Sequence, residues 1–338
     1  MKSEYQIGIK TFLKDRKENI SEFGYTAIEV SCSNWTSPFW ILYDKNVWEK
    51  KSSELIVSDY MGFKITNQNS DLRAVFNNEW DQESSRIFAL YTCSKIFETF
   101  DWFDIGANYG LYSLPFINSK KAVKSIIVEP NPFLTTCLHE TFSDTKAEII
   151  EAAVCTTKES NTHFHIKPFI SGASSIREVK KTHPLLSLCL KVKAINYREL
   201  ISVNKISSCA VVKLDIEGYE INLLQDSFLE YLSETYDRFV LFIELIPSQL
   251  SAKELEVYTD ILSQFYCLPL TNSNYKPNNK DIFSKESFFR STKKVSEFYQ
   301  IDCKKGIDWF INDPKFSYGD IIVFSNPEDS YSAIELFE

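Results

Sequence analysis

Five acidic side chains stand at the ends of short apolar runs, where carboxylates can do chemistry. They are Asp104, Glu129, Asp215, Glu217 and Glu244. A buried carboxylate without a partner costs free energy, so a hydrophobic core alone does not account for them. Carboxylates gathered at one place can favour a cationic ligand, accept the hydroxyls of a ribose or remove a proton as a general base.

The loop FDIGANYG, residues 103–110, contains two of the nine glycines in the chain. Gly106 would let the backbone turn sharply after a strand, and Gly110 would let a ligand lie against the start of a helix. Asn108 stands where the dinucleotide fingerprint G-x-G-x-x-G has its middle glycine, and Asp104 adds a negative charge. The loop therefore disfavours a pyrophosphate, and with it NAD or FAD. The alternative is a strand–turn–helix junction without a ligand.

The segment IIVEPNP places Glu129 at the end of a second apolar run, 25 residues after Asp104. An acid at this place in a nucleotide-binding sheet can accept both ribose hydroxyls of an adenosine. The alternative is an acid that caps the helix beginning near Pro130.

The segment VVKLDIEGYE alternates apolar and charged residues. Lys213, Asp215 and Glu217 follow a period of two, which predicts that all three face one side of a strand before Gly218 ends it. Three charges on one face are costly unless they serve a site. The alternative is an edge strand with a surface salt bridge.

The elements that would position these residues alternate between strands and helices. Strands are expected at 62–67, 101–106, 123–130, 147–155, 162–166, 209–218, 238–245, 266–270 and 319–326. Helices are expected at 81–100, 108–121, 131–144, 219–225 and 251–265. This alternation indicates a mostly parallel sheet with both faces covered, and ligands bind such sheets beyond the carboxyl ends of the strands.

Composition narrows the class of protein. The net charge of the 338 residues is −9 without a long basic run, which argues against a nucleic-acid partner. We expect no signal peptide and no membrane span, since the longest apolar run, FVLFIELI, is strand-sized. The eight cysteines form no C-x-x-C pair, which favours reduced thiols in a cytoplasmic protein. His163 and His165 share a strand face, but no third ligand is evident, so no metal site is assigned.

Four segments of this sequence occur together in one known family. DIGANYGLYS, VEPNP, EAAV and KLDIEGYE, followed by FIEL, resemble in order and spacing the FkbM-type S-adenosylmethionine-dependent methyltransferases over roughly residues 85–250. The resemblance implies an α/β, Rossmann-like class I methyltransferase fold. Such a fold has a seven-stranded, mostly parallel sheet with helices on both faces, and GDIIVFSN would be its antiparallel last strand.

The same resemblance implies a division of the chain. Residues 1–80 would be an N-terminal extension that acts as a lid or in acceptor binding or oligomerisation. Residues 81–338 would be the methyltransferase domain, with a C-terminal insertion at about 268–318.

S-adenosylmethionine is the cofactor that the resemblance implies, and its positive charges suit carboxylates. The residues implied around it are Asp104, Gly106, Ala107, Asn108, Gly110, Glu129, Asn131, Ala152, Ala153 and Asp215. Within this set, Glu129 would hold the ribose hydroxyls, the two alanines would lie near the adenine, and Asp215 would lie near the sulfonium and the acceptor. Ser174 and Ser175 would border the acceptor.

The reaction we expect is O-methylation of a hydroxyl on a small-molecule or glycan acceptor, above all a sugar in a glycan or polysaccharide. Asp215 is the expected general base, with Glu217 or Glu244 as substitutes. The sequence leaves open whether these acids hold a divalent metal and whether the protein forms a homo-oligomer. The alternatives are methylation of a peptide or polyketide natural product, a nicotinamide-dependent oxidoreductase and an inert Rossmann-like scaffold.

Overall fold

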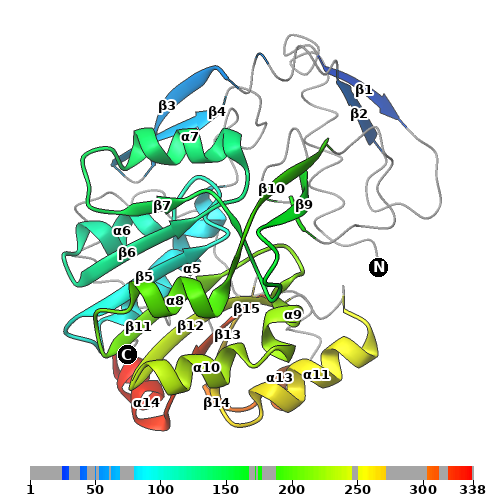
Figure 1. Cartoon of the computed structure of the whole chain (residues 1–338). Helices are drawn as coiled ribbons and strands as arrows, with labels where there is room; N and C mark the ends of the chain where they lie inside the picture. The colour runs from blue at the N-terminus through cyan, green and yellow to red at the C-terminus, as the bar shows by residue number, and fades with distance from the viewer. Residues whose placement is uncertain are drawn as a thin grey trace.

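One central sheet, covered by helices on both faces, organises the molecule (Figure 1). The computed structural model describes residues 25–29, 39–43, 50, 53–60, 62–68, 80–166, 172, 174–176, 188–245, 250–271, 303–311 and 319–336. Most of the expected N-terminal extension and of the expected insertion at 268–318 lies outside these residues. Strand β13 continues to Thr271 and so takes up the start of that insertion.

The strands of the central sheet follow the order β14-β13-β15-β12-β11-β5-β6-β7. Their bounds are β5 Phe100–Ile105, β6 Ala122–Val128, β7 Glu148–Ile150, β11 Cys209–Leu214, β12 Arg238–Leu245, β13 Tyr266–Thr271, β14 Lys304–Lys305 and β15 Gly319–Phe324. The five strands from β7 to β12 pair in parallel, whereas β15 is antiparallel to both β12 and β13. The mostly parallel sheet with an antiparallel last strand from GDIIVFSN is confirmed. It has eight described strands rather than the expected seven, because the two-residue β14 adds one at the edge.

The strand order changes direction between β5 and β11. From β5 the chain moves outward to β6 and β7, and it then returns to place β11 and β12 on the other side. At such a switch point the loops after two neighbouring strands separate and leave a crevice for a ligand. The carboxyl ends of β5 and β11 are therefore the place where a site is expected.

Two hydrophobic clusters fill the space between the sheet and its helices. The first cluster packs α5 (Trp80–Ser94), α6 (Ser113–Asn118), α7 (Pro132–Thr141) and α14 (Pro327–Glu335) on one face. The second packs α8 (Tyr197–Asn204), α9 (Glu220–Gln225), α10 (Phe228–Thr235), α11 (Ala252–Leu262) and α13 (Asp308–Ile311) on the other. Helices on both faces explain why the inner strands are apolar along their whole length rather than alternately polar.

The alternation of side chains along a strand fixes where its charges point. In β5, Trp102 belongs to the first cluster and Phe103 to the second. Asp104 is two residues after Trp102 and therefore lies on the α5–α6 side of the sheet. The same count from Val211 puts Lys213 of β11 on that side. Charges from neighbouring strands are thus brought together beneath α6.

A smaller sheet and two hairpins complete the described strands. The three-stranded sheet joins β8 (Ala153–Cys155), β10 (Leu188–Asn196) and β9 (Asn161–Ile166), of which β9 and β10 form an antiparallel arm. The hairpins are β1 (Tyr25–Glu29) with β2 (Phe39–Tyr43), and β3 (Leu55–Tyr60) with β4 (Phe63–Gln68). None of the described helices has the length and apolar character needed to cross a membrane.

Several expected elements differ from those observed. The single strand expected at 147–155 is two strands, β7 and β8, in different sheets, because the chain turns where the Ala152 N–H donates to the Ile150 carbonyl. The helix expected at 108–121 begins only at Ser113, since the loop before it contains residues with positive φ. The strand expected to carry Glu217 ends at Leu214.

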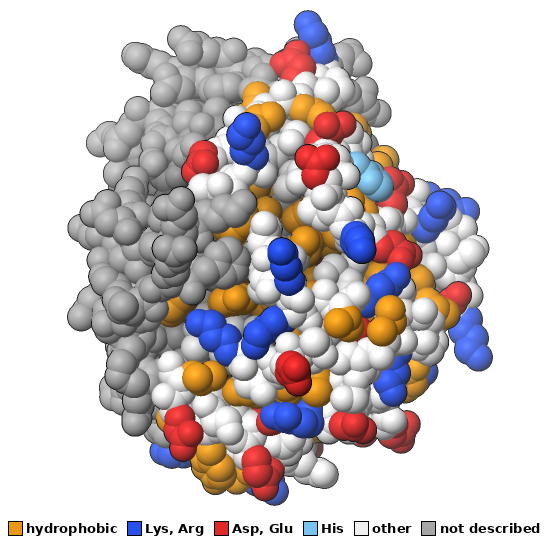
Figure 2. All heavy atoms as spheres, turned by 90° about the vertical axis from the view of Figure 1, so that its left-hand side faces the viewer, with side chains coloured by type: hydrophobic (Ala, Val, Ile, Leu, Met, Phe, Trp, Pro, Cys, Tyr) orange, Lys and Arg blue, Asp and Glu red, His pale blue; other side chains and the backbone are white. Residues whose placement is uncertain are grey.

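Acidic and basic side chains are interspersed on the face shown in Figure 2. Neither sign forms a continuous stripe over the described elements on that face. Such a stripe is the electrostatic footprint of a protein that binds nucleic acid without sequence preference.

The close approach of the loops after β5 and β11 gives a first prediction. Gly106 has φ +78°, and a Cβ atom built on it would overlap the Asp215 carbonyl oxygen. Replacing Gly106 by alanine should therefore lower the free energy of unfolding by more than about 3 kcal/mol, measured by chemical denaturation. Gly306 is the matched control, because its φ is +71° but its nearest neighbour would lie 3.6 Å away. G306A should cost about 1–2 kcal/mol, the strain of the left-handed backbone alone. Equal losses in the two variants would contradict the close approach.

Candidate functional site

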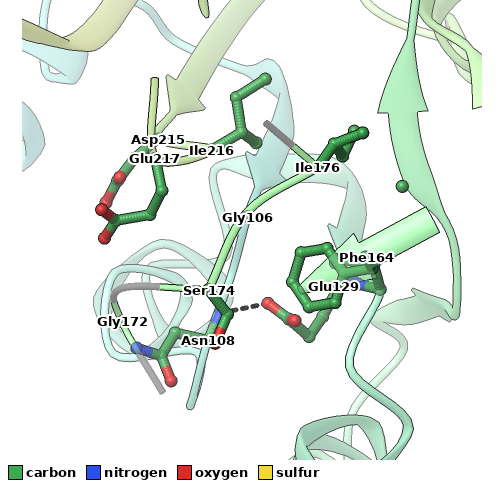
Figure 3. A pocket seen from close by; sticks show the side chains of 12 residues that line it. Gly106, Asn108, Glu129, Phe164, Gly172, Ser174, Ile176, Asp215, Ile216 and Glu217 are labelled. Atoms are coloured by element: carbon green, nitrogen blue, oxygen red, sulfur yellow. Dashed lines mark hydrogen bonds between the residues drawn. The ribbon is translucent and has the colours of Figure 1, made fainter. Parts of the chain in front are cut away.

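A pocket opens at the switch point, between the ends of β5, β6 and β11 and the β9–β10 arm (Figure 3). The empty space in it, counting the part that is open to solvent, is about 480 Å³. Its lining residues are Gly106, Asn108, Glu129, Pro130, Ala153, Phe164, Gly172, Ser174, Ile176, Asp215, Ile216 and Glu217. Three separate segments with acids or glycines in the sequence are thus brought to one cavity.

Glu129 is fixed on the floor of this pocket by the backbone. The Asn108 N–H donates to its Oε2 and the Asn131 N–H to its Oε1, each at 2.9 Å. The side chain is only 5% exposed, and this burial raises the pKa of Glu129 to about 7 although both N–H groups favour the ionised form. Glu129 is not a helix cap. That role belongs to Asn131, whose side chain accepts from the Phe133 N–H at the start of α7.

The loop after β5 is shaped by its neighbours on both sides. The N–H groups of Gly106 and Ala107 both donate to the Val128 carbonyl, and the Asp215 N–H donates to the Ile105 carbonyl. These bonds join the ends of β5, β6 and β11. They set the backbone of Gly106 and Asn108 against the pocket, and Asn108 takes a left-handed conformation with φ +54° to do so.

The structure gives a packing reason for Gly110. A Cβ atom there would lie 2.6 Å from Phe142 and 2.8 Å from Leu138, so the packing of α7 explains the glycine. Ala107 is likewise buried in the first hydrophobic cluster rather than in the pocket lining.

The residues expected around the cofactor fall into two sets. Those that line the pocket are Gly106, Asn108, Glu129, Ala153 and Asp215. Those that lie behind the lining are Asp104, Ala107, Gly110, Asn131 and Ala152, all with little or no exposed surface where they have side chains.

Lys213 is the buried cation at the centre of the switch point. Its Nζ donates to the Gly106 carbonyl at 2.5 Å, and it lies 3.1 Å from Asp215 Oδ2 and 3.8 Å from Asp104 Oδ1. Burial disfavours the charge, but Asp215 and Asp104 outweigh it and raise the pKa of Lys213 above its usual value.

Asp104 is the buried counter-ion of this lysine. It has no exposed surface, and Ser113 Oγ donates to its Oδ2 at 2.7 Å while accepting from Trp102 Nε1 at 2.9 Å. Burial raises the pKa of Asp104, against the effect of Lys213. The charge of Asp104 is therefore balanced within the protein by Lys213.

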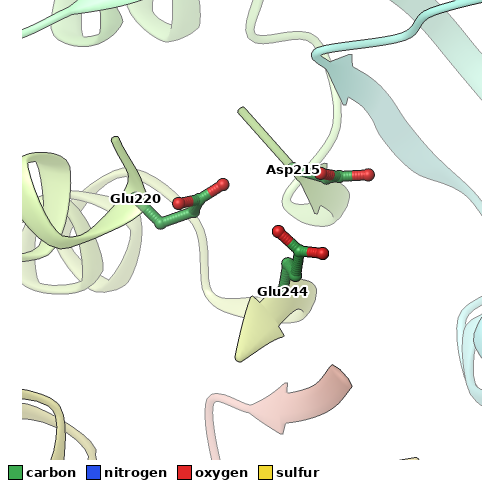
Figure 4. Close-up of side chains that lie close together, drawn as sticks. All are labelled: Asp215, Glu220 and Glu244. Atoms are coloured by element: carbon green, nitrogen blue, oxygen red, sulfur yellow. The ribbon is translucent and has the colours of Figure 1, made fainter. Parts of the chain in front are cut away.

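Three carboxylates meet beyond the end of β11, as Figure 4 shows. Oxygen atoms of Asp215, Glu220 and Glu244 all lie within 4.8 Å of one another. Glu220 accepts from the Ile216 N–H at 2.6 Å, and burial together with Asp215 raises its pKa to about 7. Burial and the neighbouring acids, Asp215 and Glu217 first among them, raise the pKa of Glu244 well above its usual value. The sequence expectation included two members of this group and missed Glu220.

A divalent cation could be shared by these three carboxylates. In the part of the chain that the structure describes, they are the one group of three or more Asp, Glu, His or Cys side chains close enough for this. The histidine pair of β9, His163 and His165, belongs to no such group of described residues. The sequence analysis assigned no metal site, and this assignment stays a prediction.

Two residues near the acidic cluster, Asp320 and Arg86, were not selected from the sequence. Asp320 of β15 pairs in register with Glu244, and Arg86 Nε of α5 lies 2.8 Å from its Oδ2. Burial raises the pKa of Asp320 to about 7. Neither residue lies in a recognisable motif, since they are far from Glu244 along the chain and meet it only through the pairing of β12 with β15.

Glu217 lies in the turn after β11 rather than in the strand. Its φ is +56°, and its carbonyl accepts from Ser175 Oγ at 2.9 Å. The expected common strand face of Lys213, Asp215 and Glu217 is therefore wrong, because the chain leaves the extended conformation after Leu214. Glu217 still lines the pocket, on the same side as Asp215 (Figure 3).

Solved structures similar to this chain have low identity and low TM-scores. The plantazolicin methyltransferase BpumL, in complex with triazolic desmethylPZN analog and SAH, has 12% identity and a TM-score of 0.34, over 75% of this chain and 91% of that one. Methyltransferase FkbM from Methylobacillus flagellatus has 12% identity and a TM-score of 0.34, over 67% and 44%. Precorrin-6y C5,15-methyltransferase from Geobacter metallireducens has 8% identity and a TM-score of 0.32, over 70% and 85%. These values are too low to transfer a substrate or a site geometry.

The sequence comparison is more specific. No curated protein matches this chain significantly. Residues 104–266, however, match the family described as "Methyltransferase FkbM domain". The matched span begins at Asp104 and includes the glycine loop, Glu129, the β9–β10 arm and the acids that follow β11 and end β12. The part of the chain that carries the pocket therefore belongs to the FkbM family of methyltransferase domains.

Proposed function

We propose that this protein is an S-adenosylmethionine-dependent O-methyltransferase whose acceptor is a hydroxyl of a sugar in a glycan or polysaccharide. One observation carries the proposal. Glu129, at the end of β6, is held by two backbone N–H groups in a pocket whose far side is formed by Asp215 and Glu217. A carboxylate fixed in this way is suited to a ribose, and a pair of acids is suited to positive charge.

The lining residues fit the methyl donor in chemical character. Each oxygen of Glu129 accepts one N–H and keeps a lone pair for a ribose hydroxyl. Pro130 and Ala153 provide apolar surface beside it. Asp215 and Glu217 would face the ammonium and sulfonium charges. When bound, the donor supplies an electrophilic methyl carbon and its own leaving group.

The acids would also handle the proton of the acceptor hydroxyl. Asp215 lines the pocket, and Lys213 fixes its position at 3.1 Å while being fixed itself by the Gly106 carbonyl. We therefore assign Asp215 as the general base, with Glu217 and Glu244 as substitutes.

The sugar acceptor is supported by the polar character of this side of the pocket. Asp215 and Glu217 offer carboxylate oxygens that can accept hydrogen bonds from neighbouring hydroxyls of one sugar. A peptide or polyketide natural product is the second acceptor class, because its hydroxyls would meet the same carboxylates. We place the activity in the cytoplasm because all the described cysteines are free thiols.

Removing the ribose contact should weaken donor binding. Glu129→Gln places an amide N–H group against one of two backbone donors and removes the charge. We expect the Kd for S-adenosylhomocysteine to rise about 10- to 100-fold, measured by calorimetry. Glu148→Gln is the matched control, because Glu148 is a half-exposed acid of β7 that pairs with Lys124 outside the pocket. Unchanged affinity in E129Q would refute the ribose assignment.

Donor binding should also depend on pH through the same carboxylate. The ionised form of Glu129 accepts ribose hydroxyls with both oxygens, and its pKa in the free protein is about 7. The Kd for S-adenosylhomocysteine should therefore fall by up to about tenfold per pH unit as the pH rises toward 7, and level off above about 8. The same titration with E129Q should be flat over this range. A parallel slope in E129Q would assign the pH dependence to another group.

Removing the general base should abolish turnover and leave donor binding nearly intact. We expect Asp215→Asn to lower the rate of labelled methyl transfer to polysaccharide or small-metabolite fractions by about 10²- to 10⁴-fold. The Kd for S-adenosylhomocysteine should change less than about threefold, and Glu217→Gln should lose less activity than D215N. Near-normal turnover in D215N would refute the base assignment. Labelling of a peptide or polyketide fraction alone would change the acceptor class.

A further inference from the structure

The β9–β10 arm is tied to the pocket at two points. The backbone N–H and carbonyl of Ser175 pair with the carbonyl and N–H of His165 in β9, at 3.1 and 2.8 Å. The Ser175 hydroxyl donates to the Glu217 carbonyl at 2.9 Å. A short stretch, residues 174–176, thus connects the arm to the acids that follow β11. The arm is fixed as a wall of the pocket rather than standing apart from it.

Phe164 is the aromatic side chain of this wall. It lies in β9, outside the central sheet, and is only 4% exposed, whereas its neighbour His163 is exposed. It belongs to neither of the two hydrophobic clusters that hold the sheet to its helices. Among the described residues, no aromatic ring packs against it within stacking distance. Phe164 is one of the residues that line the pocket.

The position of Phe164 relative to Glu129 suggests what the ring does. Both residues line the same cavity, and Figure 3 shows the ring beside the carboxylate. The other side chains of this region, Pro130, Ala153 and Ile176, are uncharged and apolar. In a nucleoside the base is joined to the ribose by one bond. A base attached to a ribose held by Glu129 therefore lies within reach of this apolar, aromatic wall.

We propose that Phe164 stacks against the base of a nucleoside held by Glu129, so that the β9–β10 arm forms part of the methyl-donor site. The inference rests on the proposed function. It assigns a role to a segment that leaves the central sheet after β7 and returns to it only at β11. The arm also connects Phe164 to the other side of the pocket, because Ser175 pairs with β9 and donates to the Glu217 carbonyl.

Calorimetry with S-adenosylhomocysteine and with adenosine alone tests the stacking. Phe164→Ala should raise both Kd values by the same factor, about 10- to 100-fold, because the lost contact is to the base that the two ligands share. Phe164→Tyr should stay within about threefold of the wild-type protein, and Phe164→Leu should fall between Tyr and Ala. A residue needed only for packing would tolerate Leu better than the polar Tyr.

Ile166→Ala is the matched structural control. Ile166 lies two residues further along β9 on the same face and is buried, but it does not line the pocket. I166A should lower the unfolding temperature and leave both Kd values within about threefold. Unchanged affinity in F164A, or an equal loss in I166A, would overturn the stacking while leaving the proposed function in place. A wild-type protein that binds neither ligand would overturn the proposed function and this inference together.

Discussion

The buried ammonium of Lys213 is the interaction on which the rest of the site depends. It lies where β5 and β11 separate, and it joins the Gly106 carbonyl, Asp104 and Asp215. A buried lysine is tolerated only when anions and carbonyl oxygens replace its water. The same contacts hold the glycine loop against the turn after β11. Without this cation, the buried Asp104 carboxylate and the Asp215 carboxylate would lose the positive charge that they share.

The acids around the switch point outnumber the cations that could neutralise them. Glu129, Glu220 and Asp320 each have a pKa raised to about 7 by burial, and that of Glu244 is raised as well. An acid whose pKa is higher in the folded than in the unfolded state stabilises the fold at low pH. This contribution is lost as the pH rises from the usual carboxyl pKa of about 4.5 to about 7. At neutral pH the free protein therefore holds charge that a positively charged ligand would relieve. A methyl donor carrying a sulfonium and an ammonium has this property.

Local patterns in the sequence were enough to predict the parallel strands and the position of Glu129, whereas the antiparallel direction of β15 came from the family resemblance. The parallel strands and Glu129 each depend on residues close together in the chain. The packing reason for Gly110 could not be predicted, because it lies in Leu138 and Phe142, which come about thirty residues later. Asp320 and Arg86 were missed because the pairing of β12 with β15 and the packing of α5 bring them to Glu244. The break between β7 and β8 was hidden within one continuous apolar segment. Phe164 gave no signal, since an aromatic residue in a strand is ordinary core material.

The position of β15 between β12 and β13 sets an order of events during synthesis. It follows β13 in the chain but lies inside the sheet, so β12 keeps an open edge until β15 has been made. The residues around Glu129 and the β9–β10 arm come earlier and do not depend on that strand. The acidic cluster does depend on it, because Asp320 reaches Glu244 only through β15. A nascent chain can therefore form the part of the pocket around Glu129 before the acidic network is complete. Until then, the exposed edge of β12 is the part of the domain most open to pairing with another chain.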